Sequence, residues 1–140
     1  MKLRSLLTAL LAIVASHGAC APSRGITLGD VAGHWKVRAL AVDSDTVLTT
    51  YQLWTSVDTS AWKIKFDSRP DTIPIRVLGV AGDSIMIQAG PYHSALRETM
   101  VTTRTTLRLR DGKLFGRSTA RYEGGTPDSI RVRTEGVRVN

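Results

Sequence analysis

From residue 33 onward, hydrophobic and polar residues alternate with a period of two, and short clusters of turn residues interrupt the alternation. In the segment WKIKF, Trp62, Ile64 and Phe66 fall on one face of an extended chain and two lysines fall on the other. This alternation is typical of a β-strand with one buried face. The same pattern predicts strands over residues 34–42, 47–55, 62–66, 73–80, 84–89, 100–110, 113–122 and 129–139.

Eight antiparallel strands with short connections can form an up-and-down barrel or a two-sheet β-sandwich. We expect the all-β barrel, because closure leaves no exposed strand edge and eight strands enclose room for side chains or one small ligand. A transmembrane barrel does not fit, because lysines and arginines would face lipid in mid-strand, each at about 2–4 kcal/mol near the midplane. The sequence therefore predicts one eight-stranded antiparallel barrel domain over residues 33–140.

The most specific local signal is Asp111-Gly112, between two alternating segments. This dipeptide favours a two-residue type I′ turn, whose central residues both need a positive φ. The turn fixes a register in which one face pairs Leu109 with Leu114, Leu107 with Gly116, Thr105 with Ser118, and Thr103 with Ala120. The other face pairs Arg110 with Lys113, Arg108 with Phe115, Thr106 with Arg117, and Thr102 with Arg121. Small hydroxyl residues on the first, inward face predict space there for water or for the polar end of a ligand.

The N-terminal segment has a different pattern. Lys2 and Arg4 precede an uncharged, mostly aliphatic run over residues 5–15, and small residues follow it. A charged head, an apolar run and a small-residue exit make up a secretory signal peptide. The apolar run is shorter than the roughly 20 residues that span a bilayer. We therefore expect a signal peptide over residues 1–19, forming a helix ahead of the barrel, and export of the remaining chain.

Cys20 is the only cysteine, so it has no partner for an internal disulfide. Two cleavage sites compete. Ala19 and Ala21 give the small-x-small form that ordinary signal peptidase accepts, whereas the small residues before Cys20 resemble a bacterial lipobox, in which His17 is atypical. A free thiol in an oxidising compartment favours lipidation, and the lipid chains would anchor the protein to a membrane. We expect lipid attachment at Cys20, a tether over residues 20–32, and a periplasmic location at the outer membrane, because a retention aspartate is missing.

Charge is distributed unevenly along the chain. Removal of residues 1–19 leaves 121 residues, enough for one domain, and lowers the net charge from +7 to +5. Residues 22–96 hold seven basic and seven acidic side chains, whereas residues 97–140 hold ten basic and five acidic ones. The whole surplus therefore lies in residues 97–140.

Six arginines of these last strands could form a basic outer face: Arg104, Arg108, Arg117, Arg121, Arg131 and Arg133. Anionic lipid head groups fit an exported protein, because arginine pairs phosphate bidentately. Nucleic acid is a poor partner, because stacking aromatic residues do not interleave with the arginines. An ordinary solvated strand exterior is the alternative.

Catalytic chemistry finds little support in the sequence. His34 and His93 lie in different segments without partners at metal-ligand spacing, and no nucleophile motif or phosphate-binding loop is present. We expect no catalytic residue, metal site or cofactor; an enzyme of this class would use His34, His93 or Tyr122. The segment GPYHS, residues 90–94, reads as a turn between strands or as a loop at the barrel mouth.

The segment Gly33-His34-Trp35, which opens the first strand, resembles the Gly-x-Trp signature of lipocalins and of shorter bacterial lipocalin-like proteins. The resemblance implies that the tryptophan plugs the closed end of the barrel and that an arginine from the end of the last strand covers the indole. Arg131, Arg133 and Arg138 are the candidates for that arginine. The lipocalin corner motif near the later strands and the long C-terminal helix are absent from the sequence.

The resemblance further implies a small apolar or amphipathic ligand in the lumen. The residues expected to line or close the lumen are Trp35, Tyr51, Trp62, Ile64, Phe66, Thr103, Thr105 and Ser118. The function expected from sequence is therefore that of an exported, lipid-anchored binding protein without catalytic activity. The alternative is a structural or assembly factor of the cell envelope that acts through the basic outer face.

Overall fold

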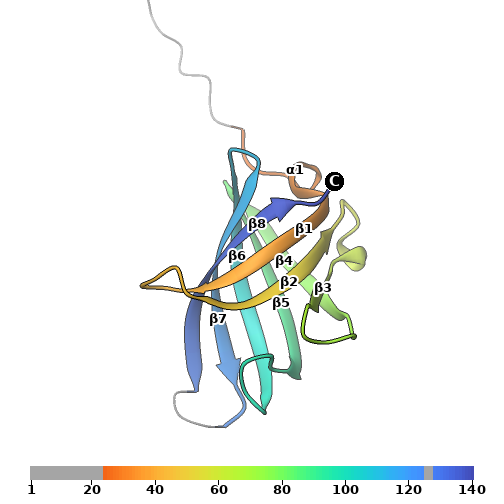
Figure 1. Ribbon diagram of the computed structural model, residues 1–140. Helices are drawn as coiled ribbons and strands as arrows, with labels where there is room; N and C mark the ends of the chain where they lie inside the picture. The colour runs from red at the N-terminus through yellow and green to blue at the C-terminus, as the bar shows by residue number, and fades with distance from the viewer. Residues whose placement is uncertain (1–23, 125–127) are drawn as a thin grey trace, which may run out of the picture.

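The computed structural model describes residues 24–124 and 128–140, which form a closed barrel of eight antiparallel strands (Figure 1). The strands are β1 (Gly33–Ala41), β2 (Val47–Thr55), β3 (Lys63–Phe66), β4 (Ile73–Ala81), β5 (Ser84–His93), β6 (Met100–Arg110), β7 (Lys113–Tyr122) and β8 (Ser129–Arg138). Each strand pairs with the next in sequence, and β8 pairs with β1. The predicted up-and-down barrel is confirmed, and the sandwich alternative is not the fold. The expected signal peptide and Cys20 lie outside the described residues.

The hairpin between β6 and β7 has the predicted turn and register. Asp111 and Gly112 have φ angles of 50° and 72°, as a type I′ turn requires. Thr105 lies opposite Ser118, and all the other predicted pairs are also present. The inward face of this hairpin therefore carries the expected run from leucines near the turn to small hydroxyl residues along the strands.

Strand β5 is longer than the alternation predicts. The expectation that residues 90–94 form a turn or a mouth loop is wrong for most of this segment, because Tyr92 pairs with Val101 and His93 pairs with Met100. A register shift between Ala89 and Tyr92 accommodates the glycine and the proline between them. Gly90 has a φ of 105°, a conformation that side-chain-bearing residues rarely adopt. The bulge keeps Tyr92 in the sheet and packed against the core.

Strand β1 also departs from simple alternation. Its register with β2 shifts between Ala39 and Leu40, so both residues are buried, whereas the alternation over residues 34–42 predicts a buried Ala41 in place of Leu40. An irregularity of this kind changes which side chains face inward beyond it. The alternation therefore describes β1 correctly only from Trp35 to Ala39.

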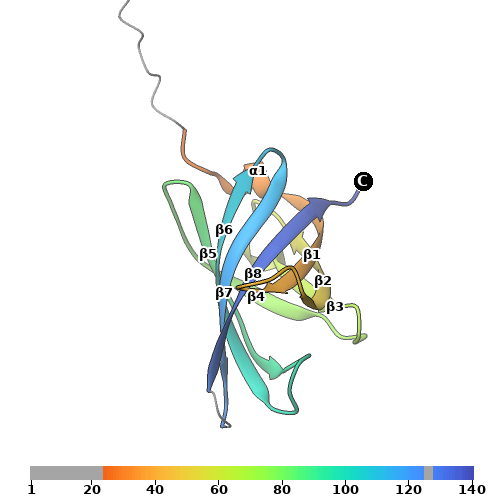
Figure 2. The same cartoon turned by 60° about the vertical axis from the view of Figure 1, so that its left-hand side comes forward.

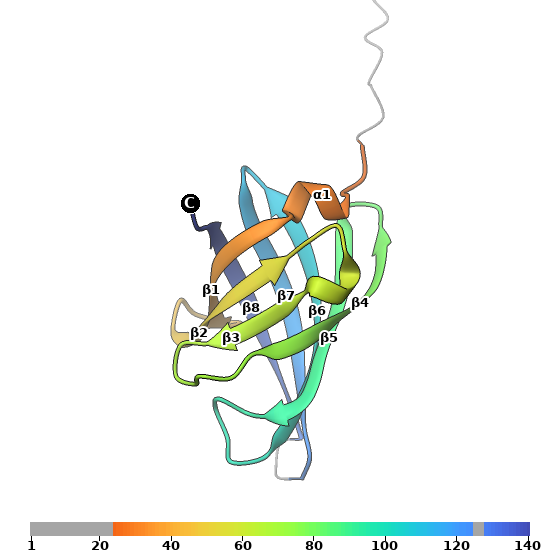
Figure 3. The same cartoon turned by 90° about the vertical axis from the view of Figure 1, so that its right-hand side faces the viewer.

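One end of the barrel is closed by the segment that precedes β1. A short helix, α1 (Leu28–Val31), lies across this end (Figure 3). Thr27 and Asp30 form a capping box at its start, and Val31 is fully buried. A 3-10 helix, η1 (Thr59–Ala61), precedes β3 at the same end. The described part of the expected tether, from residue 24, is thus packed onto the barrel.

The apolar core is concentrated at this closed end. Alternating connections place the β2–β3, β4–β5 and β6–β7 loops at the end covered by α1, and the β1–β2, β3–β4 and β5–β6 loops at the opposite, open end (Figures 1 and 2). Within the main cluster of buried residues, the largest fully buried side chains of the barrel wall lie near the closed-end limits of the strands: Trp35, Leu53, Trp62, Ile85, Leu107 and Leu114. Leu40, which is also fully buried, lies outside this cluster, near the open-end limit of β1. The position of the core leaves the other half of the barrel for a cavity.

Candidate functional site

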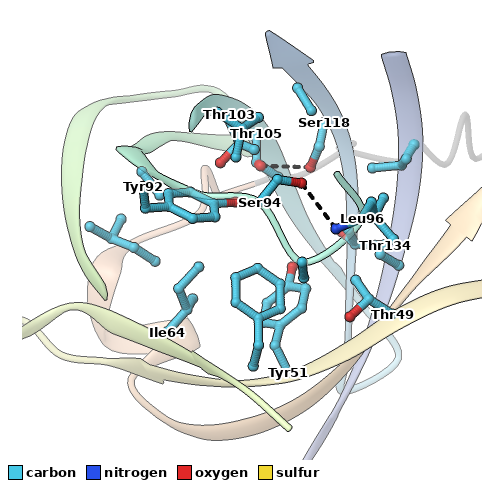
Figure 4. A pocket seen from close by; sticks show the side chains of 18 of the residues that line it. Thr49, Tyr51, Ile64, Tyr92, Ser94, Leu96, Thr103, Thr105, Ser118 and Thr134 are labelled. Carbon is cyan, nitrogen blue, oxygen red and sulfur yellow. Dashed lines mark hydrogen bonds between the residues drawn. The ribbon is translucent and has the colours of Figure 1, made fainter. Parts of the chain in front are cut away.

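A cavity of about 80 Å³ lies inside the barrel, between the packed core and the open end (Figure 4). All eight strands contribute to its wall. Apolar side chains such as Ile64, Phe66 and Ile87 form most of the lining. The hydroxyl groups at the cavity belong to Thr49, Tyr51, Tyr92, Ser94, Thr103, Thr105, Ser118, Tyr122 and Thr134.

The inward face of the β6–β7 hairpin supplies a hydroxyl pair. Thr105 and Ser118 lie 2.6 Å apart between their Oγ atoms and hydrogen-bond to each other (Figure 4). Both residues are buried. One hydroxyl donates to the other, and each oxygen keeps acceptor capacity for a group in the cavity. The pair can therefore bind a hydroxyl or amide donor without being left unsatisfied when the cavity holds no such group.

Gly116 shapes the wall next to this pair. A Cβ at this position would overlap the hydroxyl of Thr134 and would lie within 3.1 Å of side-chain carbons of Leu107 and Thr105. Any larger residue at Gly116 would therefore displace side chains of the cavity wall. Glycine at this position therefore leaves room for the side chains of Thr105 and Thr134.

Two tyrosines project into the lumen from opposite walls, Tyr51 from β2 and Tyr92 from β5 (Figure 4). Burial raises the pKa of the Tyr51 phenol above its usual value, the proximity of Tyr92 raises it further, and contact with the Thr134 hydroxyl opposes both effects. Burial also raises the pKa of Tyr92, against the effect of a contact with Thr103. Both phenols therefore stay protonated and uncharged at neutral pH and can act as hydrogen-bond donors.

The cavity is uncharged. Within residues 24–124 and 128–140, no Asp, Glu, Lys, Arg or His side chain lines it. An ion placed there would lose its hydration without gaining an opposite charge, which is strongly unfavourable. The lumen can therefore accept a neutral molecule whose body is apolar and whose polar end can hydrogen-bond to hydroxyl groups.

The closed end is sealed by Trp35 and Arg138. The Trp35 indole is fully buried, and its N–H donates to the carbonyl oxygen of Val31 at 2.8 Å. The Arg138 guanidinium lies 4.2 Å from the indole centroid and donates to the carbonyl oxygens of Ala32 and Asp30 at 2.6 and 2.7 Å. Of the three candidate arginines, Arg138 is the one that covers the indole.

Gly33 makes this contact possible. Its φ is 144°, and a Cβ would come within 2.7 Å of a guanidinium nitrogen of Arg138. Glycine is therefore needed both for the backbone conformation and for the approach of the arginine. Gly33 and Trp35, the two defined positions of the Gly-x-Trp segment, therefore both face the Arg138 guanidinium.

The open end is partly covered by the β5–β6 loop. Ser94 accepts hydrogen bonds from the backbone N–H groups of Leu96 and Arg97, and Ser94 and Leu96 reach the cavity (Figure 4). The Arg97 guanidinium lies 4.4 Å from the centroid of the Tyr122 ring. Arg69, from the β3–β4 loop, donates to the carbonyl oxygen of His93. These contacts hold the loop over the mouth of the barrel.

Six of the eight residues expected at the lumen line the cavity: Tyr51, Ile64, Phe66, Thr103, Thr105 and Ser118. Trp35 plugs the closed end, and Trp62 is buried in the packed half, where its indole N–H donates to the carbonyl oxygen of Ser56 at 2.7 Å. Both tryptophans lie beside the closed-end limits of their strands and so do not reach the cavity.

Sequence reasoning missed five polar residues of the lining: Thr49, Tyr92, Ser94, Tyr122 and Thr134. Thr134 alternates with its neighbours in β8 and could have been found from the period of two. Tyr122 ends β7 on the same face as Ser118 and Ala120 and could have been found in the same way. Tyr92 could not, because the bulge at Gly90 interrupts the alternation before it.

The two histidines lie away from the cavity. The His34 ring stacks on Trp54 with centroids 4.7 Å apart, and its Nε2 lies 2.7 Å from Oε1 of Gln52. His93 is exposed at the open end. In the part of the chain that the structure describes, no three His, Cys, Asp or Glu residues gather as metal ligands, and no helix is long and apolar enough to cross a membrane.

The six predicted basic-face arginines all lie on β6, β7 and β8, and none of them lines the cavity. Arg108 pairs with Asp83 at 3.3 Å, and Arg133 pairs with Asp45 and Glu135. Arg104 donates to the amide oxygen of Gln88 at 3.0 Å. The same three strands thus carry hydroxyl groups inward and arginines outward.

Comparison of the chain with protein-family models, with curated proteins and with solved structures gave no match.

Proposed function

We propose that this protein is a lipocalin-like binding protein that holds a small neutral molecule in its lumen. The observation that carries the proposal is the uncharged, hydroxyl-bearing cavity inside a barrel closed at one end. Concave sites with mainly apolar walls and a few convergent polar groups are typical of ligand-binding sites. Of the three residues that an enzyme of this class would use, Tyr122 lines the lumen, whereas neither histidine of the described chain reaches it.

The likeness to lipocalins is supported by the closed end. The resemblance of residues 33–35 implies an indole plug covered by an arginine from the end of the last strand. Trp35 and Arg138 have this arrangement, and Gly33 provides the space for it. The contact joins residues that are 103 positions apart in the chain, so it is independent support for a resemblance that began with one short motif.

The proposed place of action is the periplasmic side of an outer membrane, with a lipid on Cys20 as the anchor. The support for this part lies in the sequence of the first 21 residues alone. The barrel is compatible with such an anchor, because Arg24, the first described residue, lies on the side of the closed end (Figure 1).

The ligand class follows from the size and the neutrality of the cavity. A volume of about 80 Å³ is below the 300–1,000 Å³ typical of drug-sized pockets, so the ligand has a narrow body or occupies the mouth as well. The apolar wall favours an aliphatic or aromatic body, and the Thr105–Ser118 pair with the two phenols favours a hydroxyl or amide end.

A homologous series of n-alkanols tests this proposal, with binding followed by NMR shifts of the full chain. Affinity should rise about fourfold for each added methylene, the value for burial of one CH₂, until the cavity is full. Hexanoate at neutral pH is the matched control, because it has the length of hexanol but carries a charge that the lumen does not compensate. Equal binding of hexanol and hexanoate, or shifts confined to outward residues, would overturn the proposal.

A pair of variants locates the polar end of the ligand. Thr105→Val with Ser118→Ala removes both hydroxyls of one hydrogen bond and keeps the shape, so stability should change little. Hexanol affinity should fall by about fivefold, the value of one hydrogen bond of about 1 kcal/mol. Thr119→Val, an exposed position on the same strand β7, is the matched control and should leave hexanol affinity unchanged.

A further inference from the structure

A second hollow, a groove, lies on the outer surface of the barrel. It is formed by strands whose inner faces line the lumen. This groove, with a volume of about 530 Å³, runs over β4 to β8. Arg104, Arg117, Arg131 and Arg133 line it, together with exposed apolar residues. Strands β6, β7 and β8 run side by side in this part of the barrel (Figure 2).

The strand register places the four arginines in two neighbouring rows. One row is Arg104, Thr119 and Arg131 across β6, β7 and β8, and the other is Thr106, Arg117 and Arg133. Each row therefore contains one threonine hydroxyl and two guanidinium groups. The threonine is the middle residue of the first row and the end residue of the second. Such a set of donors matches the oxygens of a phosphate, which arginine binds bidentately.

The charges of this groove are only partly neutralised within the protein. Arg133 pairs with Asp45 and Glu135. In the part of the chain that the structure describes, Arg104, Arg117 and Arg131 have no carboxylate partner. Arg117 moreover lies directly opposite Arg133 in the ladder, and like charges in that position are destabilising. An anion bound in the groove would remove this repulsion.

The apolar rim indicates which anion the groove fits. Val42, Leu78 and Met86 line the groove and are 58, 41 and 40 % exposed. A soluble anion gains nothing from contact with these side chains. A surface that combines cationic with exposed apolar side chains is typical of proteins that lie in the interface of an anionic membrane.

We propose that this outer groove binds the phosphate of an anionic lipid head group at a membrane surface. Arg104, Arg117 and Arg131 contact the phosphate, and the apolar rim enters the boundary between head groups and acyl chains. The groove is separate from the lumen, so this binding does not depend on whether the lumen takes a ligand. It would lay the barrel with this groove on the membrane.

Arginine footprinting on vesicles tests the proposal with the full chain. The protein is mixed with vesicles of phosphatidylcholine alone, or of equal parts phosphatidylcholine and phosphatidylglycerol, and its arginines are modified with phenylglyoxal and quantified by mass spectrometry. Modification of Arg117 and Arg131 should be slowed about fivefold by phosphatidylglycerol, the value for one arginine near an anionic membrane. Arg110, an exposed arginine of β6 outside the groove, should react at an unchanged rate.

A matched pair of double variants separates the groove from general charge. Arg117→Gln with Arg131→Gln should abolish the protection of Arg104 by phosphatidylglycerol. Arg76→Gln with Arg110→Gln removes the same charge outside the groove and should retain that protection. Since any N-terminal anchor is the same in all variants, the difference between the pairs reports the groove. Thermal unfolding followed by circular dichroism confirms that both pairs remain folded.

Three results would overturn the proposal. Equal protection by pure phosphatidylcholine would mean that the apolar rim alone contacts the membrane. Equal protection by inorganic phosphate without vesicles would mean that the groove takes a free anion. Equal loss of protection in both double variants would mean that only the overall positive charge is attracted.

Discussion

The two ends of the barrel use similar contacts for different purposes. At the closed end, Arg138 lies 4.2 Å from the centroid of Trp35 and is bound to two backbone carbonyl oxygens. At the open end, Arg97 lies 4.4 Å from the centroid of Tyr122, but it belongs to the β5–β6 loop. The first contact joins the last strand to the segment before β1, whereas the second holds the β5–β6 loop that partly covers the cavity.

This difference separates stability from binding along the barrel axis. The closed half contains Trp35, Trp62 and the fully buried leucines of the main core cluster, and the open half contains tyrosines, threonines and free volume. An unfilled cavity forgoes the packing and hydrophobic burial that a filled core would supply. The densely packed closed half therefore makes a hollow open half compatible with a stable fold, and substitutions at the two ends should have different effects.

The largest expected effect is that of Trp35→Ala. The substitution removes a fully buried indole, so we expect a loss of about 3–5 kcal/mol of unfolding free energy. Urea unfolding followed by circular dichroism measures this loss. Trp54→Ala is the matched control, because this indole lies outside the barrel and stacks on His34, a contact of about 1 kcal/mol. Similar losses for the two variants would show that Trp35 does not hold the closed end together.

Substitution of the arginine in either arginine–aromatic contact should have a smaller effect on unfolding free energy, and the two effects should differ. Arg138→Met keeps an aliphatic stem but removes the cation and both hydrogen bonds to the carbonyl oxygens, so unfolding free energy should fall by about 1–2 kcal/mol. Arg97→Met removes the matching contact with Tyr122 from a loop, and we expect a fall of about 0.5 kcal/mol. Chemical denaturation of both variants gives the comparison. A larger loss for Arg97→Met would contradict the division between the two ends.

Most of the fold could be predicted from the sequence, because one face of each strand is buried and alternation records that face. The Asp111-Gly112 turn correctly predicted eight residue pairs of the β6–β7 hairpin. The bulges at Ala39 and Gly90 could not be located, because one added residue moves the following side chains to the other face. This explains the errors at Ala41 and Tyr92.

The candidate site was predictable only in part, for a related physical reason. Alternation shows which side chains point inward, and Thr103, Thr105 and Ser118 do so. It does not show how far along the axis the packed core extends, because that depends on strand tilt and on the segment that covers the end. Trp62 was therefore placed with the lumen residues although it lies in the packed half. For the same reason, the sequence could not tell which arginine covers Trp35.

At neutral pH we expect Tyr51→Phe, a substitution in the open half, to have a smaller effect than Arg138→Met. In the folded protein the pKa of Tyr51 is raised above the value of 10.0 that it has in an unfolded chain, mainly because the phenol is buried. Below pH 10 the phenol is protonated in both states, so loss of the hydroxyl should change unfolding free energy by about 1 kcal/mol or less. Above pH 10 the unfolded chain releases this proton while the folded protein keeps it, so stability falls as pH rises.

The fall in stability above pH 10 therefore distinguishes the two ends of the barrel. In the wild-type protein, Tyr51 should contribute up to about 1.4 kcal/mol per pH unit to the fall in stability above pH 10. Tyr51→Phe should reduce that slope, whereas Arg138→Met should lower stability equally at pH 8 and pH 10.5, since its partners are a ring and two carbonyl groups. Urea unfolding at a series of pH values gives both slopes. An unchanged slope in Tyr51→Phe would mean that water reaches the phenol in the folded state, and the open half would then be a wet channel instead of a sheltered site for a neutral ligand.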